Sequence, residues 1–336
     1  MNLTLSKYIL PLKHTFSISR ESHNTQDSMI VSLGHQGKIG YGEATANPYY
    51  HITFESMQKE IENIRTEIEN YPFTTPEDFN RFLVQKKLSN FASCALDLAA
   101  HDLYGKIVNQ PLYKIWNTDP TKYPITNYTI GIDTIENMVS KMKEQPWPIY
   151  KVKLGTDQDV QIVKELRKHT DAIFRIDANC AWTAEETIEY APELKKLGVE
   201  FLEQPLKADD WNGMEKVMHA SVLPVIADES CIVEADVEKC GYHFNGINIK
   251  LTKCGGLTPA LRMIKKGKAM GLKIMVGCMT ESSVGISAVA QLAPQLDYVD
   301  MDGAMLLSKD IANGIQIQPN GKLIYPTLGG SGITLL

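Results

Sequence analysis

No stretch of this sequence is apolar enough to span a membrane, and residues 1–12 lack the charged and then apolar pattern of a signal peptide. Clusters of basic residues are also missing, and the formal net charge of −6 argues against a nucleic-acid partner. None of the six cysteines belongs to a Cys-x-x-Cys pair, and 336 residues can bury a large core without disulfides. We therefore expect a cytoplasmic protein with reduced thiols that binds neither nucleic acid nor membrane.

The patterns that are present change near residue 120. Before this point, strand patterns come first and helical patterns follow. The strands are expected at 3–10, 28–33 and 38–42, and the helices at 55–69, 77–88 and 91–106. Strands followed by helices indicate a separate α+β domain, which we place at residues 1–120.

From residue 121 onward, apolar strand candidates alternate with amphipathic segments of helical spacing. The strands are expected at 125–130, 149–154, 173–178, 199–203, 223–228, 246–250, 273–278 and 296–302. They begin 23 to 27 residues apart, as βα units do. The pattern predicts an α/β fold with a modified TIM-type (β/α) barrel at residues 121–308. The tail, residues 309–336, is expected to fold back onto the first domain.

Carboxylates stand where three consecutive predicted strands end, and in such a barrel the chemistry lies at the carboxyl ends of the strands. These residues are Asp177, Glu203 and Asp228. Three carboxylates without Cys or His select a hard cation, Mg²⁺ or Mn²⁺, rather than Zn²⁺. A single such residue is more often a helix cap or a surface charge, but three in phase favour a metal site.

Lysines also end two of the predicted strands. Lys151 and Lys153 share one face because strand side chains alternate. Crowding of the two ammonium groups, a nearby metal and partial burial would each lower a lysine pKa toward that of a general base. Lys250 comes from the opposite side of the ring, so two lysines could exchange a proton on opposite faces of one carbon. The structural alternatives are an exposed strand edge for the pair and an ion pair with Glu229 for Lys250.

A metal suits this chemistry because a proton α to a carboxylate is weakly acidic, and a divalent ion stabilises the charge left behind. Lys-x-Lys, then Asp, Glu and Asp on the next three strands, and then a lone Lys resemble the muconate-lactonising subgroup of the enolase superfamily. Further motifs of the resemblance are Gly40-Tyr41-Gly42-Glu43, Ala95-Leu96-Asp97, Asp177-Ala178-Asn179, Glu203-Gln204-Pro205, Ala227-Asp228-Glu229-Ser230 and Asn248-Ile249-Lys250. The resemblance implies an N-terminal capping domain on the barrel and a bound Mg²⁺.

The last predicted strand ends with Asp300 and Asp302, which are similar to the Asp-x-Asp motif that holds the substrate ammonium in the dipeptide epimerases of this subgroup. Residues 277–282 also resemble the corresponding segment of the dipeptide epimerases. The resemblance is closest to the L-Ala-D/L-Glu epimerases. It implies epimerisation of the second residue of L-Ala-X dipeptides and a role in recycling cell-wall peptides. The structural alternative is that the two Asp residues only cap the loop after this strand.

The resemblance also implies a role for each residue. Lys153 removes the α-proton from one stereoisomer and Lys250 from the other, while Lys151 lowers the pKa of Lys153. Asn179 and Glu229 support the site, the first by positioning a metal-bound water and the second by orienting Lys250.

The capping domain should contact the side chain of the second substrate residue. Arg20 is a candidate partner for a glutamate carboxylate, although Glu21 beside it would repel one, and Arg20 is equally well a surface cation.

Other functions remain open at this stage. N-succinylamino acid racemases and o-succinylbenzoate synthases belong to the same subgroup, but their substrates bring no ammonium to Asp300 and Asp302. A catalytically silent barrel would bury these charges without use, which is costly. Association into a homo-oligomer is compatible with the resemblance.

Overall fold

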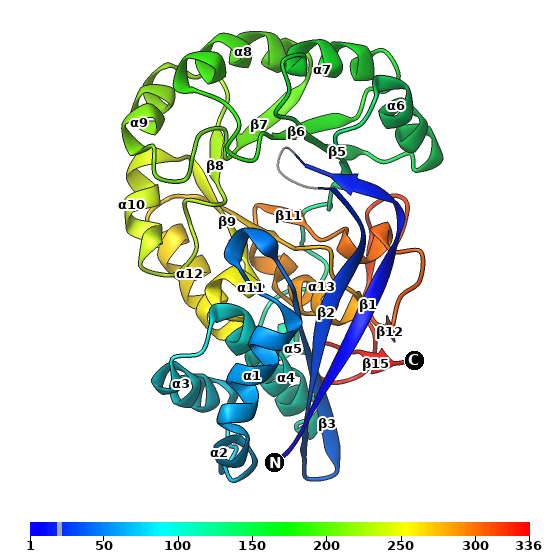
Figure 1. The fold of residues 1–336 in the computed structure, drawn as a ribbon, viewed down its shortest axis with the longest axis vertical. Coiled ribbons are helices and arrows are strands. Elements are labelled where there is room, and N and C mark those ends of the chain that lie inside the picture. The colour runs from blue at the N-terminus through cyan, green and yellow to red at the C-terminus, as the bar shows by residue number, and fades with distance from the viewer. Residues whose placement is uncertain (19–21) are drawn as a thin grey trace.

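The computed structural model of the chain describes residues 1–18 and 22–336. It shows an N-terminal domain lying against a barrel, with helices around the outside of the barrel (Figure 1). Within the described residues, no helix combines the length and the apolar character needed to cross a membrane.

The N-terminal domain, blue to cyan in Figure 1, is an antiparallel sheet with helices packed on it. In its described part the strand order is β1 (Asn2–Ser17), β2 (Ser22–His35) and β3 (Lys38–Thr45). The helices are η1 (Pro48–Tyr50), α1 (Phe54–Asn63), α2 (Arg65–Glu69), α3 (Pro76–Lys86), α4 (Asn90–Ile107) and α5 (Leu112–Ile115). The predicted α+β character is confirmed, although the helix expected at 55–69 is divided at Ile64 into α1 and α2.

The first two strands are longer than the sequence indicated. Their far ends form an arm that bends where the register shifts between Pro11 and Phe16. The arm reaches the barrel, where Ile132 N donates to Ser17 O at 2.9 Å. Apolar alternation revealed only the parts of β1 and β2 that pack on helices, because the residues of the arm are mostly exposed or half-buried.

The barrel consists of parallel strands joined in their order along the chain. Among the described residues these are β4 (Tyr128–Ile130), β5 (Ile149–Lys153), β6 (Ile173–Asp177), β7 (Val199–Glu203), β8 (Val225–Ala227), β9 (Gly246–Lys250), β10 (Lys273–Gly277) and β11 (Tyr298–Asp300). The bridge between Thr126 and Val299 joins the first strand's lead-in to the last strand. The predicted modified TIM-type barrel is confirmed.

Helices follow most of the barrel strands and cover them from outside (Figure 1). They are α6 (Ile135–Glu144), α7 (Asp159–Arg167), α8 (Ala184–Lys196), α9 (Trp211–Ala220), α10 (Asp236–His243), α11 (Leu251–Cys254), α12 (Leu257–Ala269), α13 (Ser283–Leu292), η2 (Ala293–Gln295) and η3 (Gly303–Leu306). Thr183 and Glu186 form a capping box at the start of α8.

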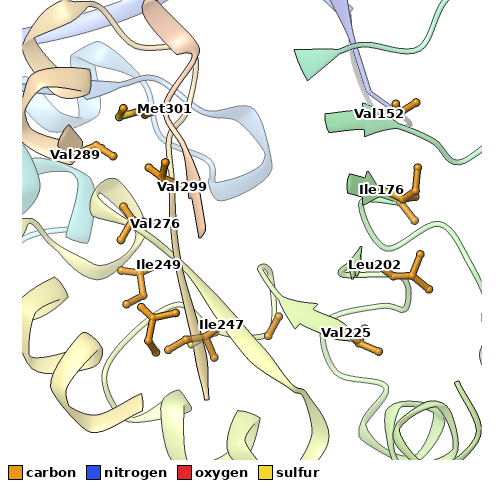
Figure 2. Packing of buried hydrophobic residues seen from close by; sticks show 14 of the residues in the cluster. Val152, Ile176, Leu202, Val225, Ile247, Ile249, Val276, Val289, Val299 and Met301 are labelled. Atoms are coloured by element: carbon orange, nitrogen blue, oxygen red, sulfur yellow. The ribbon is translucent and has the colours of Figure 1, made fainter. Parts of the chain in front are cut away.

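Side chains alternate between the two faces of each barrel strand. Val152, Ile176 and Leu202 belong to the hydrophobic layer beneath the helices (Figure 2). Their neighbours Lys153 and Asp177 lie on the other face and are in register with each other. Toward the amino ends of the strands, a separate apolar cluster is formed by Phe201, Ile226 and Met275 with Tyr298. The barrel interior is therefore packed at one end and charged at the other.

Buried carboxylates join the N-terminal domain to the rest of the chain. Glu43 in β3 accepts hydrogen bonds from Ser282 N (3.1 Å) and Gly285 N (2.9 Å), at the start of α13. Asp102 in α4 accepts one from Ser331 N (2.9 Å) in the tail. The tail forms the short strands β12 (Ala312–Asn313), β13 (Gln316–Ile317), β14 (Leu323–Ile324) and β15 (Thr334–Leu335). These contacts fix the N-terminal domain over the mouth of the barrel.

Candidate functional site

A cleft opens between the carboxyl ends of the barrel strands and the N-terminal domain. The predicted site residues that line it are Lys151, Lys153, Asn179, Asp228, Glu229, Lys250, Asp300 and Asp302. Asp177 and Glu203 are buried beside it, where they contact the lysines. Arg20 lies outside the described residues, as does Glu21.

The three predicted metal ligands converge. One oxygen from each of Asp177, Glu203 and Asp228 lies within 4.8 Å of the others. Asp177 and Glu203 end their strands in register, and Asp228 follows β8 directly. All three are 0 to 1% exposed. Three hard oxygen donors this close together fit an octahedral Mg²⁺ ion, which would also retain water or substrate oxygens as ligands.

Sharp turns after the strands aim these carboxylates inward. Asn179 and Gln204 have positive φ values of 46° and 35°, a conformation that is uncommon for residues other than glycine. Asn179 N donates to Asp177 Oδ1 at 2.9 Å. The side-chain oxygen of Gln204 accepts from Asp228 N at 2.9 Å and thereby links neighbouring strand ends. Such strained backbone is typical of functional sites, where the surrounding bonds maintain it.

The predicted lysines lie against the carboxylates. Lys151 Nζ is 2.7 Å from Glu203 Oε2, 2.8 Å from Asp300 Oδ2 and 3.1 Å from Asp177 Oδ2. Lys153 Nζ is 2.6 Å from the same Asp177 oxygen. Lys153 on β5 and Lys250 on β9 are four strands apart in the barrel order, so they approach the cleft from opposite sides.

These contacts reverse one expectation from the sequence. Burial disfavours charge, yet Asp300, Glu203 and Asp177 raise the pKa of Lys151 well above its ordinary value. In the same way, Asp228 raises the pKa of Lys250 despite the burial of that ammonium. For Lys151 and Lys250 the protein's own groups therefore raise the pKa instead of lowering it, because the expectation considered lysine neighbours and not the nearer carboxylates.

A further lysine, which the sequence patterns did not single out, contacts one of the three predicted metal ligands. Lys253 on α11 is 1% exposed, and its Nζ lies 2.5 Å from Asp228 Oδ1 and 3.0 Å from Cys231 O. Lys250 contacts the other oxygen of Asp228 at 2.8 Å. Burial would raise the pKa of Asp228, but Lys250 and Lys253 hold it well below its usual range. The three-residue spacing of the two lysines was a usable signal, but β9 ends at Lys250, so strand periodicity did not connect them.

Asp300, which ends β11, and Asp302, two residues beyond it, face the cleft from the side of β4. Asn127 Nδ2 donates to Asp300 Oδ1 at 2.7 Å, and Thr129 N donates to Asp302 Oδ2 at 2.5 Å. The carboxylates are 4% and 2% exposed. Burial and the neighbouring Asp300 raise the pKa of Asp302 to about 7. This concentrated negative charge in a buried position is suited to a cationic group of a ligand.

The N-terminal domain closes the cleft with aromatic and apolar side chains and with the polar His23, Gln26 and Asn47. Phe16 and Ile18 come from the arm, and Tyr49 and Tyr50 from η1. Tyr49 and Tyr50 stack edge to face, with ring centroids 4.9 Å apart. Burial raises the pKa of Tyr50 to about 12, so its hydroxyl is neutral. The sequence did not predict these residues, because only the folded arm and loop bring them to the barrel.

Comparisons with known proteins cover both parts of the chain. Residues 3–116 match the mandelate racemase / muconate lactonizing enzyme N-terminal domain, and residues 133–336 match the enolase C-terminal domain-like family. A protein of Maribacter sp. named L-Ala-D/L-amino acid epimerase is 74% identical over 335 residues, which cover 100% of this chain and 99% of that protein.

Two solved structures are similar over 99% of this chain and 98% of their own. The L-Ala-D/L-Glu epimerase from Bacillus subtilis, in a substrate-liganded complex, has a TM-score of 0.93 at 26% identity. The dipeptide epimerase from Enterococcus faecalis, complexed with Mg and the dipeptide L-Leu-L-Tyr, has a TM-score of 0.91 at 28% identity.

Proposed function

This chain belongs to the mandelate racemase / muconate lactonizing enzyme family of the enolase superfamily, and we propose that it is a Mg²⁺-dependent dipeptide epimerase. The substrates are L-Ala-X dipeptides, whose second residue changes configuration at its α-carbon. The observation that carries this proposal is the cleft itself, which combines a carboxylate triad, lysines on opposite sides and a buried pair of aspartates. The relative named L-Ala-D/L-amino acid epimerase supports the substrate class.

Asp177, Glu203 and Asp228 are the residues that would hold Mg²⁺. When bound, this ion supplies the positive charge that stabilises the substrate's carboxylate while the α-proton is absent. Lys253 keeps Asp228 in place from the side away from the cleft. Asn179, whose backbone bonds Asp177, supports the same position.

Lys153 and Lys250 are the proton-transfer residues. A lysine on each side of the α-carbon allows one to remove the proton and the other to deliver one to the opposite face. The lysine that starts neutral acts as the base, and its charged counterpart acts as the acid. Lys151 contacts Asp300, shares an oxygen of Asp177 with Lys153 and contributes a fixed positive charge. Glu229 and Lys250 both line the cleft and interact electrostatically.

Asp300 and Asp302 hold the N-terminal ammonium of the dipeptide. Their carboxylates are buried at one end of the cleft, where water screens an ion pair weakly. N-succinylamino acids carry a negative group at the corresponding place and would be repelled. This distinguishes the proposed activity from the racemase and synthase alternatives.

The proposed setting is the cytoplasm, where L-Ala-Glu dipeptides from cell-wall peptides would be recycled. The six cysteines are free thiols, which persist in a reducing compartment. The name of the Bacillus subtilis structure supports L-Ala-Glu as a substrate, and the broader name of the Maribacter relative supports other second residues. The aromatic lining from Phe16, Tyr49 and Tyr50 also favours acceptance of apolar side chains.

The test is incubation of the purified protein with Mg²⁺ and a library of L-Ala-L-X dipeptides in D₂O, followed by mass spectrometry and chiral separation. We expect one deuterium at the α-carbon of X together with the L-Ala-D-X product, and loss of both with EDTA. Deuterium uptake by N-succinylamino acids but by no dipeptide would replace the proposal with the racemase alternative. No exchange with either class would reject both.

A further inference from the structure

The barrel closes in an unusual way between its last and first strands. Each of the other neighbouring strand pairs is joined by a backbone ladder, whereas β11 meets the lead-in to β4 at the bridge between Thr126 and Val299. Side chains supplement this bridge, since Met301 N donates to Thr126 Oγ1 at 3.0 Å and Thr129 N donates to Asp302. The proposed ammonium site, Asp300 and Asp302, therefore lies at the seam between β11 and the residues that lead into β4, and side chains hold this seam together.

Asn127 lies at the centre of this seam and is fully buried. Its amide nitrogen donates to Asp300 Oδ1 at 2.7 Å, while Lys151 contacts the other carboxylate oxygen at 2.8 Å. Asp300 is thus held at both oxygens, which fixes the plane of its carboxylate. Without Asn127, the carboxylate could rotate toward Lys151 and present both oxygens to that ammonium.

Arg175 determines which way the amide of Asn127 points. Its Nη1 donates to Asn127 Oδ1 at 3.4 Å and to Val299 O at 3.3 Å. With the amide turned over, its oxygen would face the Asp300 carboxylate and its NH₂ group would face the guanidinium. Both contacts would be repulsive. Arg175 on one side and Asp300 on the other therefore permit only the observed orientation of the Asn127 amide.

The position of Arg175 is itself well supported. It lies on β6 two residues before Asp177, on the same face of the strand, and is 3% exposed. Its Nε donates to Glu200 at 2.8 Å, and its guanidinium lies 5.3 Å from the Phe201 ring and 5.0 Å from the Tyr298 ring. A planar cation packed against aromatic rings is far less mobile than an exposed arginine.

We propose that Asn127, oriented by Arg175, is a positioning residue that aims Asp300 at the substrate's N-terminal ammonium. This proposal rests on the proposed function, because it needs Asp300 to be the ammonium partner. Its consequence is that selectivity for a free amino terminus depends on a residue that does not line the cleft. A merely structural role would instead affect all ligands alike.

The experiment compares two ligands that differ only at the ammonium. L-Ala-L-X carries it, and N-propionyl-L-X has a hydrogen in its place, with X chosen as the best residue of the dipeptide library. Dissociation constants for both are measured by calorimetry in saturating Mg²⁺, and α-proton exchange in D₂O gives KM and kcat. The quantity of interest is the ratio of the two affinities.

In Asn127→Leu, which removes the donor at similar volume, we expect L-Ala-L-X to bind about tenfold more weakly, as for the loss of a hydrogen bond to a charged group. Binding of N-propionyl-L-X should be unchanged, and kcat for L-Ala-L-X should fall much less than its affinity. Arg175→Met should give a smaller change in the same direction. The matched control is Glu200→Gln, which removes a charge but keeps an oxygen that can accept the hydrogen bond from Arg175 Nε, so it should keep the wild-type ratio.

The outcomes separate the two proposals. A wild-type ratio near one would show that no ammonium is recognised, so the proposed role of Asp300 would fail first. A wild-type preference that persists in Asn127→Leu, or an equal loss for both ligands, would overturn the positioning role alone. If Glu200→Gln changed the affinity ratio as much as Asn127→Leu does, the positioning role would also be overturned. The change would then reflect a general disturbance of the barrel interior around Arg175. If Asn127→Leu does not fold, Asn127→Ala removes the same donor without added bulk and decides the question by the same ratio.

Discussion

At the scale of single residues, the opposed lysines predict a separation of the two half-reactions. In Lys250→Ala, epimerisation should fall by about 10²- to 10⁴-fold, because one of the two acid–base groups is gone. The stereoisomer whose α-proton faces Lys153 should still exchange that proton with D₂O. Lys153→Ala should show the reverse stereoisomer preference. Exchange is followed by NMR for each stereoisomer separately.

The control for these variants is Lys265→Ala, on the exposed side of α12. It should match the wild type in both exchange and epimerisation. Loss of exchange for the same stereoisomer in both site variants would contradict the assignment of the lysines to opposite faces.

Another residue-scale prediction concerns Glu281, a 4% exposed carboxyl that accepts a hydrogen bond from Met279 N. Burial and the neighbouring Glu43 raise its pKa to about 8, whereas an unfolded glutamate has a pKa near 4.3. Between these values the folded chain binds the proton more tightly, so Glu281 makes the protein less stable as pH rises from about 4.3 through 8. Glu281→Gln resembles the protonated group and should remove this part of the pH dependence.

The measurement is the free energy of unfolding in urea at several pH values between 5 and 8, for the wild type and Glu281→Gln. The difference between them should grow with pH in favour of the variant. Glu77→Gln, at the exposed start of α3, serves as the control and should follow the wild type. Parallel curves for the wild type and Glu281→Gln would refute the prediction.

At the scale of elements, close approach of α4 to β3 depends on glycine. A Cβ at Gly42 would lie 2.1 Å from Ala95 O and 2.5 Å from Ala99 N, both backbone atoms of α4. Gly42→Ala should therefore destabilise the protein by about 1–3 kcal/mol, as overpacking does. Gly34→Ala is the matched control, since its nearest atom outside the neighbours is Asn2 Cβ at 3.4 Å. Urea unfolding midpoints would test the pair, and equal midpoints would show that α4 can move away without loss.

The site is built on strands because successive side chains of a strand point alternately into the barrel and toward the helices outside it. Lys153 faces the cleft while Val152 packs beneath the helices, and Asp177 and Ile176 are sorted in the same way. The turns that follow the strands then hold the carboxylates by hydrogen bonds, as Asn179 N does for Asp177. The arm of β1 and β2 follows no such pattern, since its residues are mostly exposed or half-buried.

At the scale of the whole molecule, the charged end of the barrel predicts stabilisation by Mg²⁺. Binding to the folded chain alone adds about 2.7 kcal/mol at 100 times Kd, so the melting temperature should rise when Mg²⁺ is added. Asp228→Asn should lose most of this rise, because one of the three proposed ligands becomes neutral. Asp209→Asn, on the exposed surface, should keep it. Scanning calorimetry with and without EDTA measures the shift, and a full rise in Asp228→Asn would place the ion elsewhere.

Much of this protein was predictable from the sequence alone. Apolar strand candidates that alternate with amphipathic segments at a repeat of 23 to 27 residues predicted the barrel, because each βα unit buries its strand under a helix. The same repeat placed Asp177, Glu203, Asp228 and Lys250 at strand ends, where a barrel brings them together. These patterns can be read along the chain, because spacing and apolarity do not depend on which distant segments meet in space.

The tertiary structure decided the features that depend on contacts between distant segments. Asn127 and Asp300 meet only because the barrel closes between its first and last strands, and Lys253 on α11 meets Asp228 after β8 only in the folded barrel. The rise in the pKa of Lys151 follows from distances to carboxylates on three other strands. Electrostatic energy depends on separation in space, which no spacing along a sequence specifies, so these properties could be read only from the folded chain.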